Sequence, residues 1–191
     1  MEPPAWMAPA TGAVAFGTCC AMVGLYVYGG TLPETHEARV RAEVDVPVER
    51  AWALATDFGG RAAWRPNVAR VERLGDVKRP DQGPDAPDSQ VWREHDQGDD
   101  RFDLIVLDAT PPHLVLATAR PEDVGMAAEW TWTVTGASGR SVIEVKETGK
   151  IRNQLVRGWW SLSAGPYAAI GPDLEAFVRA LGEDRPRIER D

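Results

Sequence analysis

Residues 38–46 read Ala-Arg-Val-Arg-Ala-Glu-Val-Asp-Val, so apolar and charged side chains alternate along the whole stretch. This period of two is typical of a strand that buries one face and exposes the other. Pro47 follows directly and suits the first position of a helix, where a missing backbone N–H costs nothing. The segment that it opens ends at Gly59-Gly60. The stretch therefore predicts a half-buried strand followed by a helix, as in an α+β domain.

More strand-like runs follow, separated by turns rich in Gly, Pro or Asp. They cover residues 68–74, 90–95, 101–108, 113–120, 127–135 and 140–148. Because these runs are short and closely spaced, they predict an antiparallel meander, in a sheet of about six to seven strands. The longest connection, residues 75–89, is rich in Asp, Pro and Gly. It predicts a surface insertion or the rim of a pocket.

The C-terminal part predicts helix. Apolar residues recur there at steps of three and four: Tyr167, Ile170, Leu174, Phe177, Val178 and Leu181. Pro172 marks a helix start and Gly182 its end, while Gly165-Pro166 separates an earlier helical stretch, residues 153–162. We expect one long kinked helix or two pieces, packed on the concave face of a twisted sheet. A charged tail, residues 184–191, follows.

The N-terminal segment has no charged side chain from Pro3 to Pro33. Residues 9–28 are apolar enough and long enough, at about 20 residues, to predict one transmembrane helix. Trp6 precedes this run and Tyr26 and Tyr28 close it, as interfacial aromatic residues would. A cleaved signal peptide would need a basic start, and a buried soluble helix would carry a polar face. We therefore expect a membrane anchor and linker over residues 1–33 and a domain over residues 34–183.

Charge and cysteine content exclude several classes of site. The net charge is −8 and the chain has no Lys/Arg cluster, which argues against nucleic acid as a partner. Cys19 and Cys20 are adjacent within the apolar stretch, so no disulfide framework is expected. The three histidines are scattered without ligand spacing. We expect neither a metal nor a cofactor.

Arg39 and Arg41, just after the apolar stretch, favour a single-pass membrane protein with a cytoplasmic domain.

Four stretches resemble the START-like, or SRPBCC, superfamily, also called polyketide cyclase/dehydrase and lipid-transport-like. They are residues 45–52 leading into Asp57, residues 64–67, residues 130–132 and residues 147–153. The resemblance covers residues 39–182 and implies a helix-grip fold. In this fold a curved sheet wraps around a long C-terminal helix, and a cavity lies between the sheet and the helix. Members bind lipids, sterols, polyketides or other apolar ligands, and some catalyse cyclisation or dehydration. Many bacterial members similarly begin with one hydrophobic helix.

Glu147 is the candidate catalytic residue. By alternation it shares one strand face with Ile143 and Val145, so its carboxylate would point towards the cavity. There it could orient a ligand or act as a general acid/base. The alternative is a strand-end glutamate that reaches solvent or pairs with an arginine.

Aromatic and aliphatic side chains predict the wall of a ligand-binding pocket or, equally, a filled core. The candidate ligand-binding residues, with Glu147, are Phe102, Leu104, Trp130, Trp132, Ile143, Val145, Trp159 and Trp160.

Three functional hypotheses follow. The first is a membrane-anchored protein that binds or transports an apolar small molecule or lipid. The second is a cyclase/dehydratase-like enzyme that uses the same cavity, with Glu147 and either His95 or Arg93 as acid/base groups. The third is an interaction module with a filled core and no ligand. An internal cavity would distinguish the first two from the third.

Overall fold

The computed structural model describes residues 8–79, 83, 85–98, 100–119, 126–163, 165–184 and 186–191. Among these, the side chains of residues 8–17, Ala119 and Met126 are not described. Trp6, part of the 75–89 connection and the last residue of the predicted 113–120 strand lie outside the described residues.

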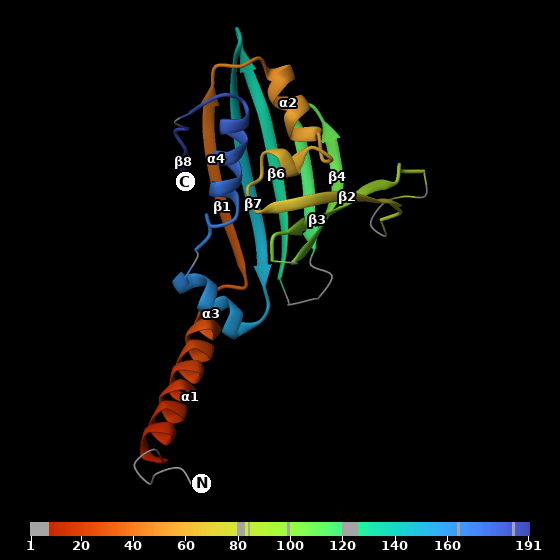
Figure 1. Cartoon of the computed structure of the whole chain (residues 1–191). Coiled ribbons are helices and arrows are strands. Elements are labelled where there is room, and N and C mark those ends of the chain that lie inside the picture. The colour runs from red at the N-terminus through yellow and green to blue at the C-terminus, as the bar shows by residue number, and fades with distance from the viewer. Residues whose placement is uncertain are drawn as a thin grey trace.

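The described strands form one antiparallel sheet in the order β2-β3-β4-β5-β6-β7-β1-β8 (Figure 1). The strands are β1 (Thr35–Val44), β2 (Val68–Val77), β3 (Ser89–Asp96), β4 (Arg101–Thr110), β5 (His113–Ala119), β6 (Met126–Ala137), β7 (Arg140–Ile151) and β8 (Glu189–Arg190). The predicted meander is confirmed, because β2 to β7 pair in sequence order. β1 then pairs with β7. The eighth strand, which the sequence did not predict, is a two-residue pairing of the charged tail with β1.

Two helical segments connect β1 to β2. They are α2 (Val48–Thr56), which begins directly after Pro47, and the 3₁₀ turn η1 (Arg61–Ala63). At the other end of the chain, α3 (Gln154–Ser163) and α4 (Ile170–Ala180) are separate helices. Of the two alternatives for the C-terminal part, the structure therefore has two pieces.

The core lies between α4 and one face of the sheet (Figure 1). Leu174 and Phe177 of α4 are fully buried, and so is Val40 of β1. The Phe177 ring packs edge-on against Trp132 at 5.1 Å and against Trp64 at 5.4 Å between ring centroids. Such edge-to-face contacts add to the free energy gained from burial alone. The curved antiparallel sheet and the C-terminal helix confirm the α+β, helix-grip prediction.

A helix is present over α1 (Ala8–Thr31), and it extends away from the sheet (Figure 1). Its C-terminal end packs closely on α3, because a Cβ atom on Gly29 or on Gly158 would lie within 3 Å of backbone atoms of the other helix. The Nε atom of Arg157 on α3 donates a 2.7 Å hydrogen bond to the Gly29 carbonyl. No helix among the described residues is both long and apolar enough to cross a membrane, so the expected transmembrane span is not supported.

Candidate functional site

A cavity lies between the inner face of the sheet and the chain that enters α4. It consists of two adjoining hollows of about 330 Å³ and about 190 Å³, which we call together the sheet cavity. Both hollows are lined by Phe102, Thr118, Trp130 and Ala169. The larger hollow extends to Arg65, and the smaller one reaches the base of the domain near α3.

Five of the candidate residues line the sheet cavity: Phe102, Leu104, Trp130, Glu147 and Trp160. Phe102 and Leu104 belong to β4, Trp130 to β6, Glu147 to β7 and Trp160 to α3. The meander thus brings together side chains that are up to 58 positions apart in the chain (from Phe102 to Trp160).

Four other candidates are placed elsewhere. Trp132, Ile143 and Val145 are buried in the core and do not line the sheet cavity. Trp159, which was predicted to bind the ligand, is instead 64% exposed and does not line the sheet cavity. Successive helical residues point about 100° apart, and Trp160 is the one that α3 directs towards the cavity.

Glu147 forms a buried pair with His36 at the smaller hollow. The Nε2 atom of His36 lies 3.0 Å from Oε1 of Glu147, and the two side chains are 15% and 8% exposed. Trp160 packs against the His36 ring, with ring centroids 4.3 Å apart. The second carboxyl oxygen, Oε2, is buried and has no hydrogen-bond partner among the described residues. Glu147 therefore neither reaches solvent nor pairs with an arginine.

The sequence interpretation missed His36, although a signal for it exists. β1 begins at Thr35, and His36 shares the inward face with Ala38 and Val40 by simple alternation. The predicted strand began three residues later, at Ala38, so His36 was left outside it. A strand extended towards the N-terminus would have placed it opposite Gly149.

Gly149 provides the space that His36 occupies. A Cβ atom on Gly149 would lie 2.1 Å from Cε1 and 2.4 Å from Nε2 of His36. We therefore expect Gly149→Ala to displace the imidazole and break its bond to Glu147, at a cost of about 1–3 kcal/mol in stability. The ring resonances of His36 measured by NMR should move in this variant. They should stay in place in Gly24→Ala, where a Cβ atom meets nothing within 4 Å; unchanged resonances in both variants would contradict the assigned pair.

The proposed acid/base residues Arg93 and His95 lie on the opposite face of β3. Arg93 pairs with Asp103 at 2.6 Å, and His95 lies 2.9 Å from a carboxyl oxygen of Glu72. Neither lines the sheet cavity. Because strand residues alternate between faces, it is Glu94 that points inwards.

Glu94 is the centre of a buried charge network that the sequence interpretation missed. The Nε atom of Arg61 donates a 2.5 Å hydrogen bond to one of its carboxyl oxygens, and Arg65 donates to the other. Arg65 also donates to Asp173 of α4 from Nη2, at 2.8 Å. The network therefore connects η1, β3 and α4, and Arg65, Glu94 and Asp173 form one end of the larger hollow.

Burial and pairing move the pKa values of this network in different directions. Burial would raise the pKa of Glu94, but Arg61 and Arg65 together lower it below its ordinary value of 4.5. Burial raises the pKa of Asp173 despite the attraction of Arg65. Burial also lowers the pKa of Arg61, and Glu94 only partly offsets this. For Arg65 the attraction of Asp173 and Glu94 outweighs burial and raises the pKa.

These shifts predict how stability depends on pH. Glu94 is a stronger acid in the folded chain, so its contribution is fully present above about pH 4.5 and is lost as the pH falls through its lowered pKa. The effect of Asp173 has the opposite sign, because its folded-state pKa is raised. We expect the acid loss of stability to be shallower in Glu94→Gln and steeper in Asp173→Asn than in the wild type. Urea midpoints between about pH 5 and about pH 3 test this; equal slopes in all three proteins would contradict it.

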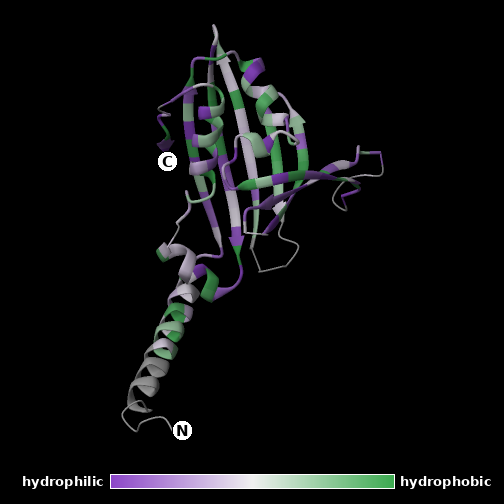
Figure 2. Ribbon diagram, in the orientation of Figure 1, coloured by the Kyte–Doolittle hydropathy of each residue, from purple (hydrophilic) through white to green (hydrophobic). Residues whose placement is uncertain are grey.

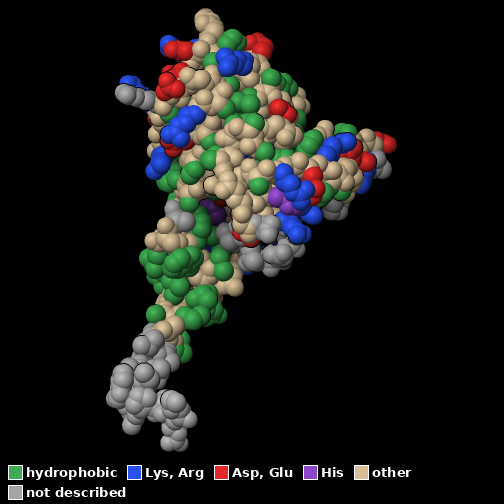
Figure 3. Space-filling model, viewed as in Figure 1, with side chains coloured by type: hydrophobic (Ala, Val, Ile, Leu, Met, Phe, Trp, Pro, Cys, Tyr) green, Lys and Arg blue, Asp and Glu red, His purple; other side chains and the backbone are tan. Residues whose placement is uncertain are grey.

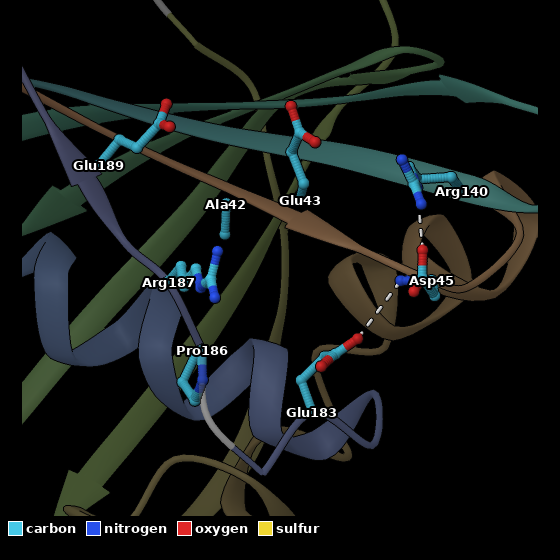
Figure 4. Close-up of a pocket in the computed structure, with 8 residues that line it drawn as sticks. All are labelled: Ala42, Glu43, Asp45, Arg140, Glu183, Pro186, Arg187 and Glu189. Atoms are coloured by element: carbon cyan, nitrogen blue, oxygen red, sulfur yellow. Dashed lines mark hydrogen bonds and ion pairs between the residues drawn. The ribbon is translucent and has the colours of Figure 1, made fainter.

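A third hollow, of about 390 Å³, is separate from the sheet cavity and lies between β1, β8 and the chain after α4 (Figure 4). Charged side chains line most of it, and Asp45 lies between Arg140 and Glu183. The Nε atom of Arg140 lies 2.9 Å from Asp45, and the Glu183 carboxylate accepts a 3.4 Å hydrogen bond from the Asp45 backbone. Because the Asp45 and Arg140 side chains are well exposed and bonded to each other, this hollow is a weaker candidate than the sheet cavity.

Known structures share this fold at low sequence identity. The Zhui aromatase/cyclase from Streptomyces sp. R1128 superposes with a TM-score of 0.59 at 16% identity, over 76% of this chain and 93% of that one. Truncated norcoclaurine synthase from Thalictrum flavum gives 0.56 at 13% identity, over 79% and 96%. A conserved protein from Geobacillus kaustophilus gives 0.56 at 14% identity, over 81% and 99%. Identities this low establish the fold alone.

No curated protein matches the chain. The family described as "Polyketide cyclase / dehydrase and lipid transport" matches residues 35–183, the whole domain from β1 to the end of the α4 region. This match confirms the superfamily that the sequence motifs resemble. Since it covers well over half of the 191 residues, the chain belongs to the polyketide cyclase/dehydrase and lipid transport family.

Proposed function

We propose that the protein binds an apolar, ring-containing small molecule in the sheet cavity. The observation that carries this proposal is the wall of the cavity, where Phe102, Leu104, Trp130 and Trp160 surround two adjoining hollows of about 330 Å³ and about 190 Å³. Small-molecule sites typically have volumes of about 300–1,000 Å³ and apolar walls with a few fixed polar groups. An interaction module with a filled core would lack such a space.

Native mass spectrometry of the freshly purified protein tests this proposal. We expect a reproducible adduct of an apolar species that disappears after organic extraction. Ala128 lines the smaller hollow, so Ala128→Trp should fill it and weaken the adduct. Thr131→Trp, on the other face of the same strand, is the matched control and should keep the adduct. The absence of any adduct, or one of equal strength in both variants, would count against the proposal.

A second candidate is an enzyme that transfers protons in this cavity, as a cyclase or dehydratase does. The observation in its favour is the His36–Glu147 pair beside an apolar hollow, in which the second carboxyl oxygen of Glu147 has no hydrogen-bond partner within the described part of the chain. His36 fixes one oxygen of Glu147, which leaves the other to act as general base. The neighbour named as an aromatase/cyclase supports this candidate through its fold alone.

A nitrobenzisoxazole that opens when a base removes its ring proton tests for this reactivity. The base takes the C–H proton, the electrons of that bond form the nitrile as the N–O bond breaks, and the ring opens to a coloured cyano-nitrophenolate. We expect wild-type protein to accelerate ring opening by about 10²–10⁴ over buffer and Glu147→Gln to lose this activity while it still binds neutral apolar probes. Asp103→Asn, on the outer face of the sheet, is the control. Equal rates for the wild type and Glu147→Gln would exclude Glu147 as the base.

We also propose that α1 and α3 bring the cavity to a lipid bilayer. Large apolar side chains on these helices are well exposed, among them Met22, Val23, Tyr26, Val27, Trp159 and Leu162. Hydrophobic residues are seen in the described part of α1 in Figure 2, and hydrophobic side chains gather at the base of the molecule in Figure 3, whereas the Lys, Arg, Asp and Glu side chains in that view lie on the domain above it. Residues 3–33 carry no charge that would oppose insertion. On this proposal Trp160, which lines the cavity, lies next to the lipid-facing side chains of α3.

Co-sedimentation with phosphatidylcholine vesicles tests this third proposal. We expect the wild type to sediment with the vesicles and Trp159→Ser/Leu162→Ser to sediment less, because the double variant removes exposed apolar area from α3. Replacing the exposed Leu74, which lies on β2 away from these helices, is the control. Binding that is equally strong in the double variant would contradict a role for α3.

A further inference from the structure

We infer that the ligand of the sheet cavity carries a neutral hydroxyl group, which binds between the indole N–H of Trp130 and the second carboxyl oxygen of Glu147. The inference rests on the proposed binding function and adds the chemical class of the ligand.

Trp130 and Glu147 are neighbours in the wall of the smaller hollow. They are directly paired across β6 and β7, so their side chains lie on the same face of the sheet about 5 Å apart at Cβ. Both line the hollow, and they are only 8% and 6% exposed. The cavity wall therefore holds two polar side chains that are more than nine-tenths buried.

Each of these side chains has one hydrogen-bonding atom without a partner among the described residues. In Trp130 it is Nε1, a donor, and in Glu147 it is Oε2. The other oxygen of Glu147 is occupied by His36, which leaves Oε2 as the available one. The guanidinium carbon of Arg65 lies over the Trp130 ring, 5.8 Å from its centroid. Buried polar groups are nearly always hydrogen-bonded, so a donor and an acceptor on paired residues of the cavity wall are the groups that a polar group of the ligand would satisfy.

The two atoms together select a hydroxyl. A hydroxyl oxygen accepts from the Trp130 N–H while its hydrogen is donated to Glu147. A ketone or ether only accepts and would leave the Glu147 oxygen unpaired. A carboxylate on the ligand would be repelled by the Glu147 carboxylate, and an ammonium group would leave the indole N–H without an acceptor. A hydroxyl forms both hydrogen bonds with one oxygen atom, because that oxygen donates and accepts at the same time.

Two other buried indole N–H groups lie outside the sheet cavity and serve as a comparison for Trp130. Trp64 and Trp132 are also buried, and their Nε1 atoms have no partner in the portion of the chain that the structure describes, but neither side chain lines the sheet cavity. Trp132 packs instead against Phe177 in the core. It therefore provides a matched control, since Trp132→Phe removes the same atom from the same strand outside the cavity.

Three naphthyl probes test the inference: naphthalene, β-naphthol and β-naphthyl methyl ether. Equilibrium dialysis measures the Kd of each for the full chain. We expect β-naphthol to bind wild-type protein about tenfold more tightly than either of the others, which corresponds to two modest hydrogen bonds. Trp130→Phe and Glu147→Met should each reduce this preference to threefold or less, whereas Trp132→Phe should retain it.

The outcomes separate this inference from the function on which it rests. If all three probes bind wild-type protein equally well, the hydroxyl site is wrong and the apolar binding function stands. If the preference persists in both Trp130→Phe and Glu147→Met, the hydroxyl binds elsewhere and the inference is overturned. If no probe binds, both the inference and the proposed function fail.

Discussion

Replacement of Glu94 with Gln should lower the free energy of unfolding by about 3–5 kcal/mol. Glu94 is 3% exposed and accepts hydrogen bonds from Arg61 and Arg65, and Arg61 is itself only 1% exposed. Without the carboxylate, the Arg61 guanidinium stays buried with its charge uncompensated. Removal of one partner from a buried ion pair is costly for this reason. Urea unfolding followed by tryptophan fluorescence measures the change.

Two further variants distinguish this effect from the loss of any charge. Glu144 pairs with Arg39 on the surface at 3.6 Å, so Glu144→Gln should change stability by at most about 1 kcal/mol after screening by solvent. The double variant Arg61→Leu/Glu94→Leu should regain much of the loss, because apolar residues can replace a buried ion pair without penalty. Arg65 then still has Asp173 as its partner. Equal effects of Glu94→Gln and Glu144→Gln would show that the network does not connect β3 to α4.

The second large effect is expected from Phe177→Ala, which should destabilise the domain by about 3–5 kcal/mol. Phe177 is fully buried on α4 and contacts the rings of Trp64 and Trp132. Truncation removes the side chain that holds the helix against the sheet and leaves a cavity that rigid neighbours cannot close. Urea unfolding followed by tryptophan fluorescence measures this loss in the free energy of unfolding.

Arg179→Ala on the same helix is the control for Phe177→Ala. Arg179 is exposed and pairs only with Glu175, one turn earlier on α4, among the described contacts. Its removal should change stability by about 0.5 kcal/mol or less. If Phe177→Ala were no more damaging than Arg179→Ala, the core would not depend on the contact between α4 and the sheet.

Most of the fold was predictable because its elements have regular patterns. The alternation in residues 38–46 and the evenly spaced runs of the meander correspond to β1 and to β2–β7. Two features were not predictable from periodicity. The pairing of Glu189–Arg190 with β1 has no hydrophobic signal, since both side chains are exposed. The membrane span was predicted from the uncharged, apolar run and its flanking aromatic residues, but no described helix is both long and apolar enough to cross a membrane. Such local features also do not show that α1 packs on α3 through the close approach of Gly29 and Gly158.

The candidate site was predictable only in part. Strand alternation correctly directed Glu147 inwards, and the cavity wall contains Phe102, Leu104, Trp130 and Trp160. Alternation does not show which inward side chains line a cavity and which pack against α4. The sequence therefore predicted the same role for Trp130, which lines the cavity, and Trp132, which packs against Phe177 of α4.

The buried charge network around Glu94 was also not predicted from the sequence. Arg61 lies in the short 3₁₀ turn η1, Arg65 follows it, and Asp173 lies on α4. No local pattern indicates that Glu94 binds all of these segments together. Such a network depends on tertiary contacts between segments far apart in the chain.

The central claim is that the sheet cavity binds an apolar, ring-containing molecule. Titration of the full chain with N-phenylnaphthylamine, a neutral fluorescent probe, tests it most directly, with Ala128→Trp as the filled-cavity variant and Thr131→Trp as its control. We expect saturable binding of one probe per chain to the wild type and to Thr131→Trp, and an affinity at least about tenfold weaker in Ala128→Trp. Unsaturable binding, or equal affinity in all three proteins, would contradict it.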